Sequence, residues 1–443
     1  LPENSQSERL RPCFFSFTKM EHTKTDAENT VTPQSIITED NVARTLLADK
    51  GLDAQLTSYK VVDFTKRGDN YASVVSSVEV NYLLHGQENT INYIVKLNPC
   101  RSFQNLEELN HVMFTKEGKF YQILVPEINS VLEKAGREPL HLPRCFHVDY
   151  TNGREQIYLE DMRAKGFSMF DRRQGLSKEH TELVLKELAR LHSASFVLKT
   201  NLSNALSSKD DFLQKDFLTY ISNCDEAILQ AMKGHLVTAS DLLQRIGGYE
   251  KAVSWVEGLK PKLAALLTTG LKSEHFDGIC HGDCWNNNLL FRYNEDGHPI
   301  DVILLDLQVC RQASIATDLN YLLFTSLTGK TRKLNLRHFL LTYFSAYKEV
   351  LENAGLPMYF TEEELIAEYR EKNTFGAYVG MMIIPAVLIE PADVPDMSDE
   401  VIDLEKITQE FREKIVSMLD KNPLIKPRFL DIFDELIETG LIS

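Results

Sequence analysis

Residues Ile279–Phe291 read ICHGDCWNNNLLF. An apolar run comes before the polar residues of this segment, and another apolar run follows them. Asp283 and Asn288 lie five residues apart between the two runs. Polar side chains held at a fixed spacing between two strand-like runs are typical of a catalytic loop on a rigid scaffold. We therefore take this segment as the starting point for predicting the fold and the site.

The five-residue spacing of Asp283 and Asn288 matches the phosphoryl-transfer loop H-R-D-x-x-x-x-N. In that loop the aspartate accepts the proton of the acceptor hydroxyl, and the asparagine holds a magnesium ion. The spacing therefore predicts a base at Asp283 and a metal ligand at Asn288.

The sequence that follows Asn288 predicts a hairpin. Strand-like runs at 289–293 and 300–305 flank an Asp-Gly pair that ends at Gly297, and such pairs favour tight turns. Gly297 lies nine residues from both Asn288 and Asp306, so the two polar ends become neighbours and face one metal. One amide and one carboxylate suit magnesium, which also keeps water and phosphate ligands. The alternative is an asparagine that caps a turn and an aspartate that ends a strand.

Residues 66–73, which read KRGDNYAS, lie between strand-like runs at 56–64 and 74–84. They predict a turn that covers phosphate groups. Gly68 lets consecutive backbone N–H groups point at an anion, and Ser73 adds a hydroxyl donor. A single glycine in a polar hairpin is more often typical of an ordinary turn.

Lys96 interrupts an apolar face of the next predicted strand, 91–97, and needs an anion. Phe114, Glu117, Tyr121 and Leu124 recur at helical spacing, which places Glu117 on a buried stripe. A buried carboxylate is costly unless it is paired. We therefore expect a Lys96–Glu117 ion pair like the one that positions the phosphate-binding lysine in kinase folds. The alternative is two unrelated surface charges.

Residues 157–162, which read IYLEDM, predict a hinge between two lobes. Edge backbone groups there can pair with adenine, whereas Glu160 and Asp161 can instead cap the next element. The chain then becomes helical: Ser177 can cap a helix in which His192 is more typical of a core histidine than of a catalyst. Further helices are predicted near 211–233, 239–268, 336–354, 361–389 and 403–420.

Composition bounds the class of protein. A chain of 443 residues exceeds one ordinary core, so two lobes are expected. Its formal net charge of −16 argues against nucleic acid or an anionic membrane as the main partner. The seven cysteines are odd in number and form no C-x-x-C pair, which favours a reducing, cytoplasmic location. No apolar run is long enough for a membrane span, and Ala377–Ile389, broken by Pro385, predicts a core helix.

Three motifs together resemble the ecdysteroid kinase-like family, which belongs to the wider choline kinase and aminoglycoside phosphotransferase group. They are HGD-x-W-x-x-N-x-x-F at 281–291, LDLQ at 305–308 and DL-x-YL at 318–322. Upstream, GDNYAS at 68–73, VK at 95–96, Glu117 and LEDM at 159–162 match in the same order, so the resemblance covers roughly residues 45–420. Leu307 stands where the family commonly has phenylalanine, which affects only local packing.

The resemblance implies an α+β, bilobal protein-kinase-like fold, with a small β-rich N-lobe that contains one main helix and a large, mostly helical C-lobe. We expect a disordered tail at 1–35, the N-lobe at 36–160 and the C-lobe at 161–443. The implied reaction uses ATP and Mg²⁺ to phosphorylate a hydroxyl of an ecdysteroid or another lipophilic alcohol, including foreign ones. The implied catalytic residues are Asp283, Lys96 and His281, the metal ligands are Asn288 and Asp306, and the nucleotide contacts are Gly68, Asn70, Ser73, Lys96, Glu117, Glu160 and Met162.

Four other functions are alternatives to a kinase for lipophilic alcohols. A choline or ethanolamine kinase would need an aromatic cage, which Tyr343, Phe344, Tyr347, Tyr359 and Phe360 could supply, although their helical spacing favours a core. A kinase-shaped binding protein without activity would have lost Lys96, Asp283, Asn288 or Asp306. A hydrolase built on Cys284 and His281 lacks an oxyanion-hole motif. A protein kinase would carry A-P-E and G-x-G-x-x-G motifs, and neither is present. We expect a small-molecule substrate and no obligate protein partner.

Overall fold

The computed structural model describes residues 32–63, 73–100, 106–201, 212–213, 226–394 and 404–443. Most of the predicted tail, 1–35, lies outside these residues. The turn that contains Gly68 and Asn70 also lies outside them.

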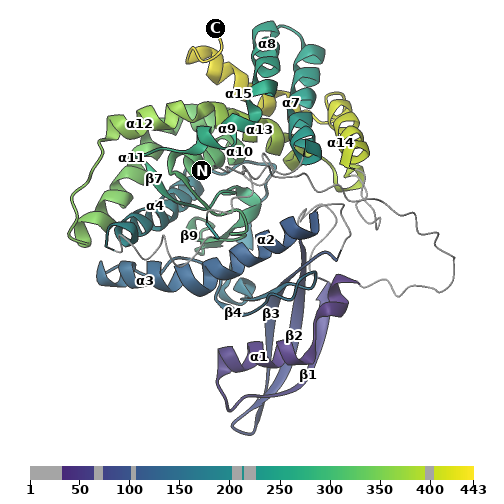
Figure 1. Cartoon of the computed structure of the whole chain (residues 1–443), viewed down its shortest axis with the longest axis vertical. Helices are drawn as coiled ribbons and strands as arrows, with labels where there is room; N and C mark the ends of the chain where they lie inside the picture. The colour runs from purple at the N-terminus through teal and green to yellow at the C-terminus, as the bar shows by residue number, and fades with distance from the viewer. Residues whose placement is uncertain (1–31, 64–72, 101–105, 202–211, 214–225, 395–403) are drawn as a thin grey trace, which may run out of the picture. The chain divides into compact units, whose positions relative to one another are not determined.

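The first part of the described chain builds a five-stranded antiparallel sheet in the order β1-β2-β3-β5-β4 (Figure 1). The strands are β1 (Gln55–Asp63), β2 (Val74–Leu84), β3 (Gln87–Leu97), β4 (Cys145–Asp149) and β5 (Gln156–Glu160). The predicted strand 91–97 in fact begins at Gln87. His85 and Gly86 both have positive φ (52° and 78°), so a two-residue turn joins β2 directly to β3.

Helix α1 (Glu39–Lys50) begins after Thr38, whose side chain accepts a hydrogen bond from the backbone N–H of Asn41. The Asn41 side chain donates to Asp149 at the end of β4 over 2.9 Å. This contact fixes α1 to the edge strand of the sheet.

Helices α2 (Leu106–Lys119) and α3 (Val125–Lys134) form one run in Figure 1, joined by a π-helical turn at Phe120–Leu124. The backbone N–H of Val125 donates to Phe120, five residues back. Pro126 has no N–H for the carbonyl four residues before it, which explains the wider turn. The run keeps Phe114, Glu117, Tyr121 and Leu124 buried, as their spacing predicted.

The remainder of the described chain is mainly helical. Its longer helices are α4 (Lys178–Asn201), α7 (Glu226–Ile246), α8 (Glu250–Leu259), α10 (Ala316–Ser326), α11 (Gly329–Asn353), α12 (Glu362–Glu371), α13 (Asn373–Leu388), α14 (Leu404–Met418) and α15 (Ile425–Glu438). Short helical turns lie at Pro33–Ile36, Met162–Lys165, Lys260–Lys262, Leu263–Leu266 (α9), Thr269–Leu271, Asn286–Asn288 and Pro391–Asp393.

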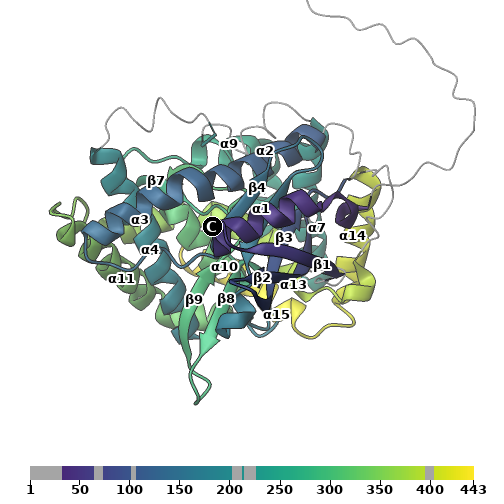
Figure 2. The ribbon, with the colours of Figure 1, turned by 90° about the horizontal axis from the view of Figure 1, so that it is seen from below.

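Two small sheets accompany these helices. One contains β6 (Ser168–Met169), β8 (Leu289–Tyr293) and β9 (Pro299–Leu304), and the other pairs β7 (Asp277–Cys280) with β10 (Arg311–Ser314). Strands β8 and β9 form the predicted hairpin, with Leu289 opposite Leu304, and Figure 2 shows its tip extending from the helices. Their pairing brings Asn288 and Asp306 to the same end of the ladder.

Several predicted helix boundaries were wrong. Helix α7 runs through the predicted gap between 233 and 239 and ends at Gly247-Gly248, where φ is 77° and 81°. Two consecutive left-handed glycines terminate a helix, so the predicted helix 239–268 is broken there. The predicted helix 361–389 is divided at Lys372 into α12 and α13.

Helix α13 is buried along most of its length and carries Pro385 in its last turn, as expected of a core helix. No helix among the described residues is both long and apolar enough to cross a membrane. The aromatic residues proposed for a cage also pack as core: Tyr343, Tyr347 and Phe360 are buried, and the hydroxyls of Tyr347 and Tyr359 lie 3.0 Å apart.

The predicted α+β class, with an N-terminal sheet followed by a mainly helical part, is confirmed. The two parts share one hydrophobic cluster, which includes Phe114 of α2, Ile157 of β5, Leu191 of α4 and Leu307 after β9. The boundaries 36–160 and 161–443 stay predictions.

Close packing of α10 on α13 predicts the effect of a single methyl group. A Cβ at Gly376 would lie 2.5 Å from the side-chain oxygen of Asn320 and 2.6 Å from the Phe324 ring. We expect Gly376→Ala to lower the free energy of unfolding by about 1–3 kcal/mol through overpacking. Gly258→Ala in α8, where a Cβ meets nothing within 4 Å, should instead raise it by up to about 1 kcal/mol. Urea denaturation checks both, and equal stability of the two variants would contradict the packing described.

Candidate active site

Lys96 is the centre of a buried charged network. Its ammonium lies 2.5 Å from Oε2 of Glu117 and 2.7 Å from Oδ1 of Asp306, and it donates to Oε1 of Gln308 over 3.2 Å. Lys96 and Glu117 are almost fully buried, whereas the Asp306 side chain is 26% exposed. The predicted Lys96–Glu117 pair therefore forms, and the structure adds Asp306 and Gln308 to it.

The charge state of Lys96 follows from these partners. Burial alone would lower the pKa of Lys96, but the negative charges of Asp306 and Glu117 outweigh that effect and raise it. Lys96 therefore remains a cation in the absence of any bound anion. A permanent cation that still reaches a partly exposed carboxylate is suited to binding phosphate oxygens.

Asp306 and Asn288 meet where the β8–β9 hairpin closes. The backbone N–H of Leu305 donates to the Asn288 carbonyl over 2.9 Å, which extends the ladder beyond the two strands. Asp306 itself adopts φ = 63°, a left-handed conformation that is uncommon for a residue with a side chain. The strain turns the chain sharply at this carboxylate, as is frequent at functional sites.

Asp283 and Asn288 are joined directly. The Asn288 amide nitrogen donates to Oδ2 and to the backbone carbonyl of Asp283, both over 2.9 Å. Because its nitrogen is used in this way, the Asn288 oxygen is the atom available to a metal. The donors present, an amide oxygen and a carboxylate at one hairpin end, fit magnesium in chemical type.

The pKa of Asp283 is raised to about 7. Burial is the largest cause, and the nearby negative charge of Asp306 adds to it. Hydrogen bonds from Tyr321, Asn288 and Trp285 act in the opposite direction but are weaker. A carboxylate with a pKa near neutrality is a better proton acceptor than an ordinary aspartate.

Asp318, at the start of α10, holds the loop that carries Asp283. Its carboxylate accepts the backbone N–H groups of His281 (2.6 Å) and Gly282 (2.9 Å), and His192 donates to it over 3.0 Å. Burial opposes its ionisation, but the bond from His192 and the adjacent charges lower the pKa of Asp318. His192 also contacts the hydroxyl of Tyr343, so it is a satisfied core histidine, as predicted.

The loop fits only because residue 282 is glycine. Gly282 adopts φ = 87°, and a Cβ there would lie 2.3 Å from the carbonyl oxygen of Val309. A side chain at this position would push the loop away from the segment that leads into β10.

His281 is a buried residue next to the site. Its ring is buried, its Nε2 bonds the carbonyl of Leu305 over 2.9 Å, and the backbone N–H of Asp283 donates to its Nδ1 over 3.3 Å. Burial lowers the pKa of His281, which keeps the ring neutral. Its observed contacts are therefore with the segments that carry Asp283 and Asp306.

The predicted hinge residues have separate partners. Glu160 at the end of β5 pairs with Lys165 over 2.8 Å, and Asp161 caps the short helix Met162–Lys165 by accepting from Arg163. Met162 is buried with Phe167 and Ile303, and the partly buried Leu290 and Leu305 pack on them. Ser73, the described residue of the predicted phosphate turn, is largely buried and directly precedes β2.

Sequence reasoning did not assign roles to Gln308, Asp318 or Tyr321. Gln308 contacts Lys96, Asp318 supports the loop, and the Tyr321 hydroxyl bonds Asp283. Two signals were available: Gln308 follows Asp306 by two residues, and Asp318 and Tyr321 lie three residues apart, which places them on one face of a helix.

A second group of potential metal ligands lies in the core. Ligand atoms of His192, Cys280 and Asp318 come within 4.8 Å of one another, and all three residues are buried. Asp318 is already committed to the loop N–H groups and His192 to Tyr343, so this group is accounted for by hydrogen bonding.

No curated protein matches the chain in sequence. Among solved structures, a mutant of aminoglycoside 2'-phosphotransferase-IIIa in complex with GDP is similar over 92% of this chain and 100% of its own, with 11% identity and a TM-score of 0.36. That similarity is too low to support an inference about this protein. The model of the ecdysteroid kinase-like family matches residues 67–356, which is well over half of the chain and includes every residue of the network around Lys96. Kinase-like phosphotransferases are the class to which such a match points, and the chain belongs to the ecdysteroid kinase-like family.

Proposed function

We propose that this protein is an ATP-dependent, Mg²⁺-requiring kinase that phosphorylates a hydroxyl of an ecdysteroid or another lipophilic alcohol. One observation carries the proposal: Lys96 contacts both Glu117 and Asp306, while the end of the same hairpin binds Asp283 through Asn288. A phosphate-binding cation, a metal-binding pair and a base are therefore within one connected set of contacts.

Each residue then has a defined role. Lys96, kept charged by Glu117, binds the α- and β-phosphates of the nucleotide. Asn288 and Asp306 hold magnesium through their side-chain oxygens. When bound, the metal neutralises phosphate charge and orients the group that is transferred. His281 positions the loop by its bond to the Leu305 carbonyl.

The transfer step conserves atoms and charge in a simple way. The acceptor hydroxyl oxygen forms a bond to the γ-phosphorus as the bond from that phosphorus to the bridging oxygen of ADP breaks. Asp283 takes the hydroxyl proton, and ADP leaves with the bridging oxygen. A pKa near 7 lets Asp283 hold that proton briefly and release it to solvent afterwards.

The hinge supplies a surface for the base of the nucleotide. Met162, Phe167 and Ile303 form a small apolar cluster, and Leu290 and Leu305 beside them remain partly exposed. Leu290 lies two residues after Asn288, and Leu305 directly precedes Asp306. A nucleotide base that packs on these two leucines would therefore lie next to the metal-binding pair. Glu160 and Met162 can then contribute backbone groups to adenine, which is one of the two alternatives that the sequence left open.

The packing of the aromatic residues and the family both bear on the identity of the acceptor. The aromatic residues that a choline cage would need are packed against one another as core. An alcohol with an apolar body therefore fits better than a quaternary ammonium. The described cysteines are all free thiols, which agrees with a proposed cytoplasmic location.

Asp283→Asn should abolish transfer without unfolding the protein. Loss of the base is expected to lower kcat roughly 10²–10⁴-fold, while ATP affinity changes little. The variant should also be at least as stable as the parent protein at pH 8. Because the folded-state pKa of Asp283 is raised, its ionised form costs stability above pH 7, and that cost disappears as the pH falls towards 4.

The assay is transfer of label from γ-labelled ATP to a panel of steroid and other lipophilic alcohols. Asp296→Asn, the same change at an exposed position in the turn of the hairpin, serves as the matched control and should retain activity. Near-normal turnover by purified Asp283→Asn would exclude the base assignment. Failure of the parent protein to phosphorylate any alcohol would favour a kinase-shaped binding protein instead.

The pH dependence of kcat/KM should report the ionisation of Asp283. The base must be deprotonated, so log kcat/KM should rise by about one unit per pH unit below pH 7 and level off above it. Excess Mg²⁺ should move the inflection to lower pH, because a cation on Asp306 offsets the charge that raises the pKa of Asp283. A flat profile between about pH 5.5 and 8.5 would contradict a titrating base at this position.

A further inference from the structure

Arg311, the first residue of β10, is a buried cation without a hydrogen-bonding partner on one edge. Its exposed fraction is 3%, yet neither Nε nor Nη2 has an acceptor within the described part of the chain. An arginine cannot lose its proton to avoid this situation. A buried charge of this kind is normally paired, so the working protein should supply an acceptor here.

The guanidinium lies against the loop that carries Asp283. Its Nη1 is 3.0 Å from the position a Cβ would take on Gly282, and its Cζ is 5.9 Å from the ring centre of Phe375. The ring of Phe375 is in turn 6.2 Å from that of Tyr321, whose hydroxyl bonds Asp283. Arg311 is therefore connected to the base through Phe375 of α13 and Tyr321 of α10.

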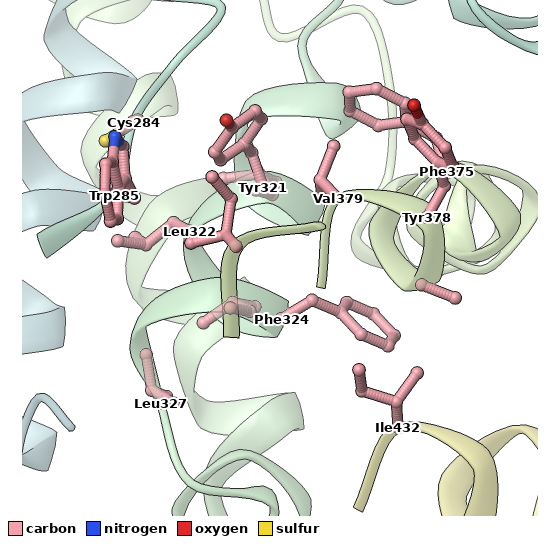
Figure 3. Close-up of a cluster of buried hydrophobic side chains, with 14 of the residues drawn as sticks. Cys284, Trp285, Tyr321, Leu322, Phe324, Leu327, Phe375, Tyr378, Val379 and Ile432 are labelled. Atoms are coloured by element: carbon pink, nitrogen blue, oxygen red, sulfur yellow. The ribbon is translucent and has the colours of Figure 1, made fainter. Parts of the chain in front are cut away.

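Apolar surfaces surround this position. Figure 3 shows Trp285, Tyr321 and Phe375 in one cluster of buried side chains, drawn from the loop, from α10 and from α13. Arg311 adjoins this cluster through its contact with Phe375. Both unpaired nitrogens are covered by protein atoms, so an acceptor reaches the guanidinium only when neighbouring side chains move.

The identity of the two unpaired atoms indicates the chemistry of the missing partner. Nε and Nη2 form the side of the guanidinium whose two N–H bonds run parallel. That edge binds the two oxygens of a carboxylate or of a similar oxyanion in a bidentate manner. A single hydroxyl or a ring face would satisfy only part of it.

Arg311 is also one of the residues that line a cavity of about 730 Å³. Three cations, Lys199, Lys272 and Arg311, line it with two carboxylates, Glu274 and Asp277. Lys199 lies 2.6 Å from Asp277, so this pair is largely neutralised. The other charged side chains of the cavity wall are Lys272, Arg311 and Glu274.

We propose that Arg311 is a specificity-determining residue that binds a carboxylate on the acceptor alcohol. The preferred acceptors are then lipophilic hydroxy acids, oriented by Arg311 at one end while Asp283 deprotonates the hydroxyl. This inference rests on the proposed kinase function. The same edge could instead grip the phosphoryl group in transit, which has the same oxyanion chemistry, and the experiment distinguishes the two sources.

The test uses the full chain with Mg²⁺-ATP and matched pairs of alcohols, each a hydroxy acid and its methyl ester. The parent protein should show a kcat/KM at least about 10-fold higher for the acids, because only they fill the bidentate edge. Arg311→Lys keeps the charge but not the fork, and it should remove this preference while changing ester turnover by less than about 3-fold. An equal loss on acids and esters would assign Arg311 to the phosphoryl group or to packing, and a parent preference for esters would overturn the proposal.

Binding measurements separate this inference from the proposed function. Thermal stabilisation by a hydroxy acid, relative to its ester, is measured without nucleotide for the parent protein, Arg311→Lys and Asp283→Asn. The acid should stabilise the parent and Asp283→Asn alike, and it should not stabilise Arg311→Lys. Carboxylate-selective binding without any phosphate transfer would leave the role of Arg311 standing and remove the kinase assignment. If Arg311→Lys does not fold, the parent protein still decides: equal stabilisation by acid and ester would overturn the proposal.

Discussion

The organisation of this protein depends on one constraint, that a lysine buried in a sheet must be paired. Lys96 meets it with Glu117 from α2 on one side and Asp306 from the end of the β8–β9 hairpin on the other. The two carboxylates come from segments that are 189 residues apart (306 − 117) in the chain. Satisfying this single cation therefore joins the sheet, the long helix and the hairpin, and it gathers the charged groups that the proposed reaction needs.

A second constraint places the base. The loop from His281 to Asn288 makes a left-handed turn at Gly282 and presents two N–H groups to the carboxylate of Asp318. Fixing the backbone in this way leaves the Asp283 side chain between Tyr321 and Asn288, partly desolvated and close to a second carboxylate. The raised pKa of Asp283 thus follows from how the loop is anchored. Burying the ionised Asp283 lowers the stability of the folded protein, and it also provides a base that works near neutrality.

Local patterns predicted much of this arrangement. The Asp-Gly turn and its equal arms predicted the hairpin, and helical spacing placed Glu117 on the buried face, where it needed Lys96. The breaks at Gly247-Gly248 and Lys372 were missed because apolar periodicity continues across them, and backbone conformation rather than side-chain pattern ends those helices. Arg311 was missed for a different reason: its contacts with the loop that carries Asp283 are tertiary, and periodicity cannot reveal them.

The central claim is that Asp306 carries the metal while Lys96 carries the phosphates. It is tested most directly by measuring ATP affinity with Mg²⁺ and with EDTA, in the parent protein and in Asp306→Ala. The account predicts that Mg²⁺ strengthens ATP binding to the parent protein and that most of this gain is absent in the variant, because the ion loses its charged ligand. Phosphate transfer that survives both the substitution and EDTA would contradict it.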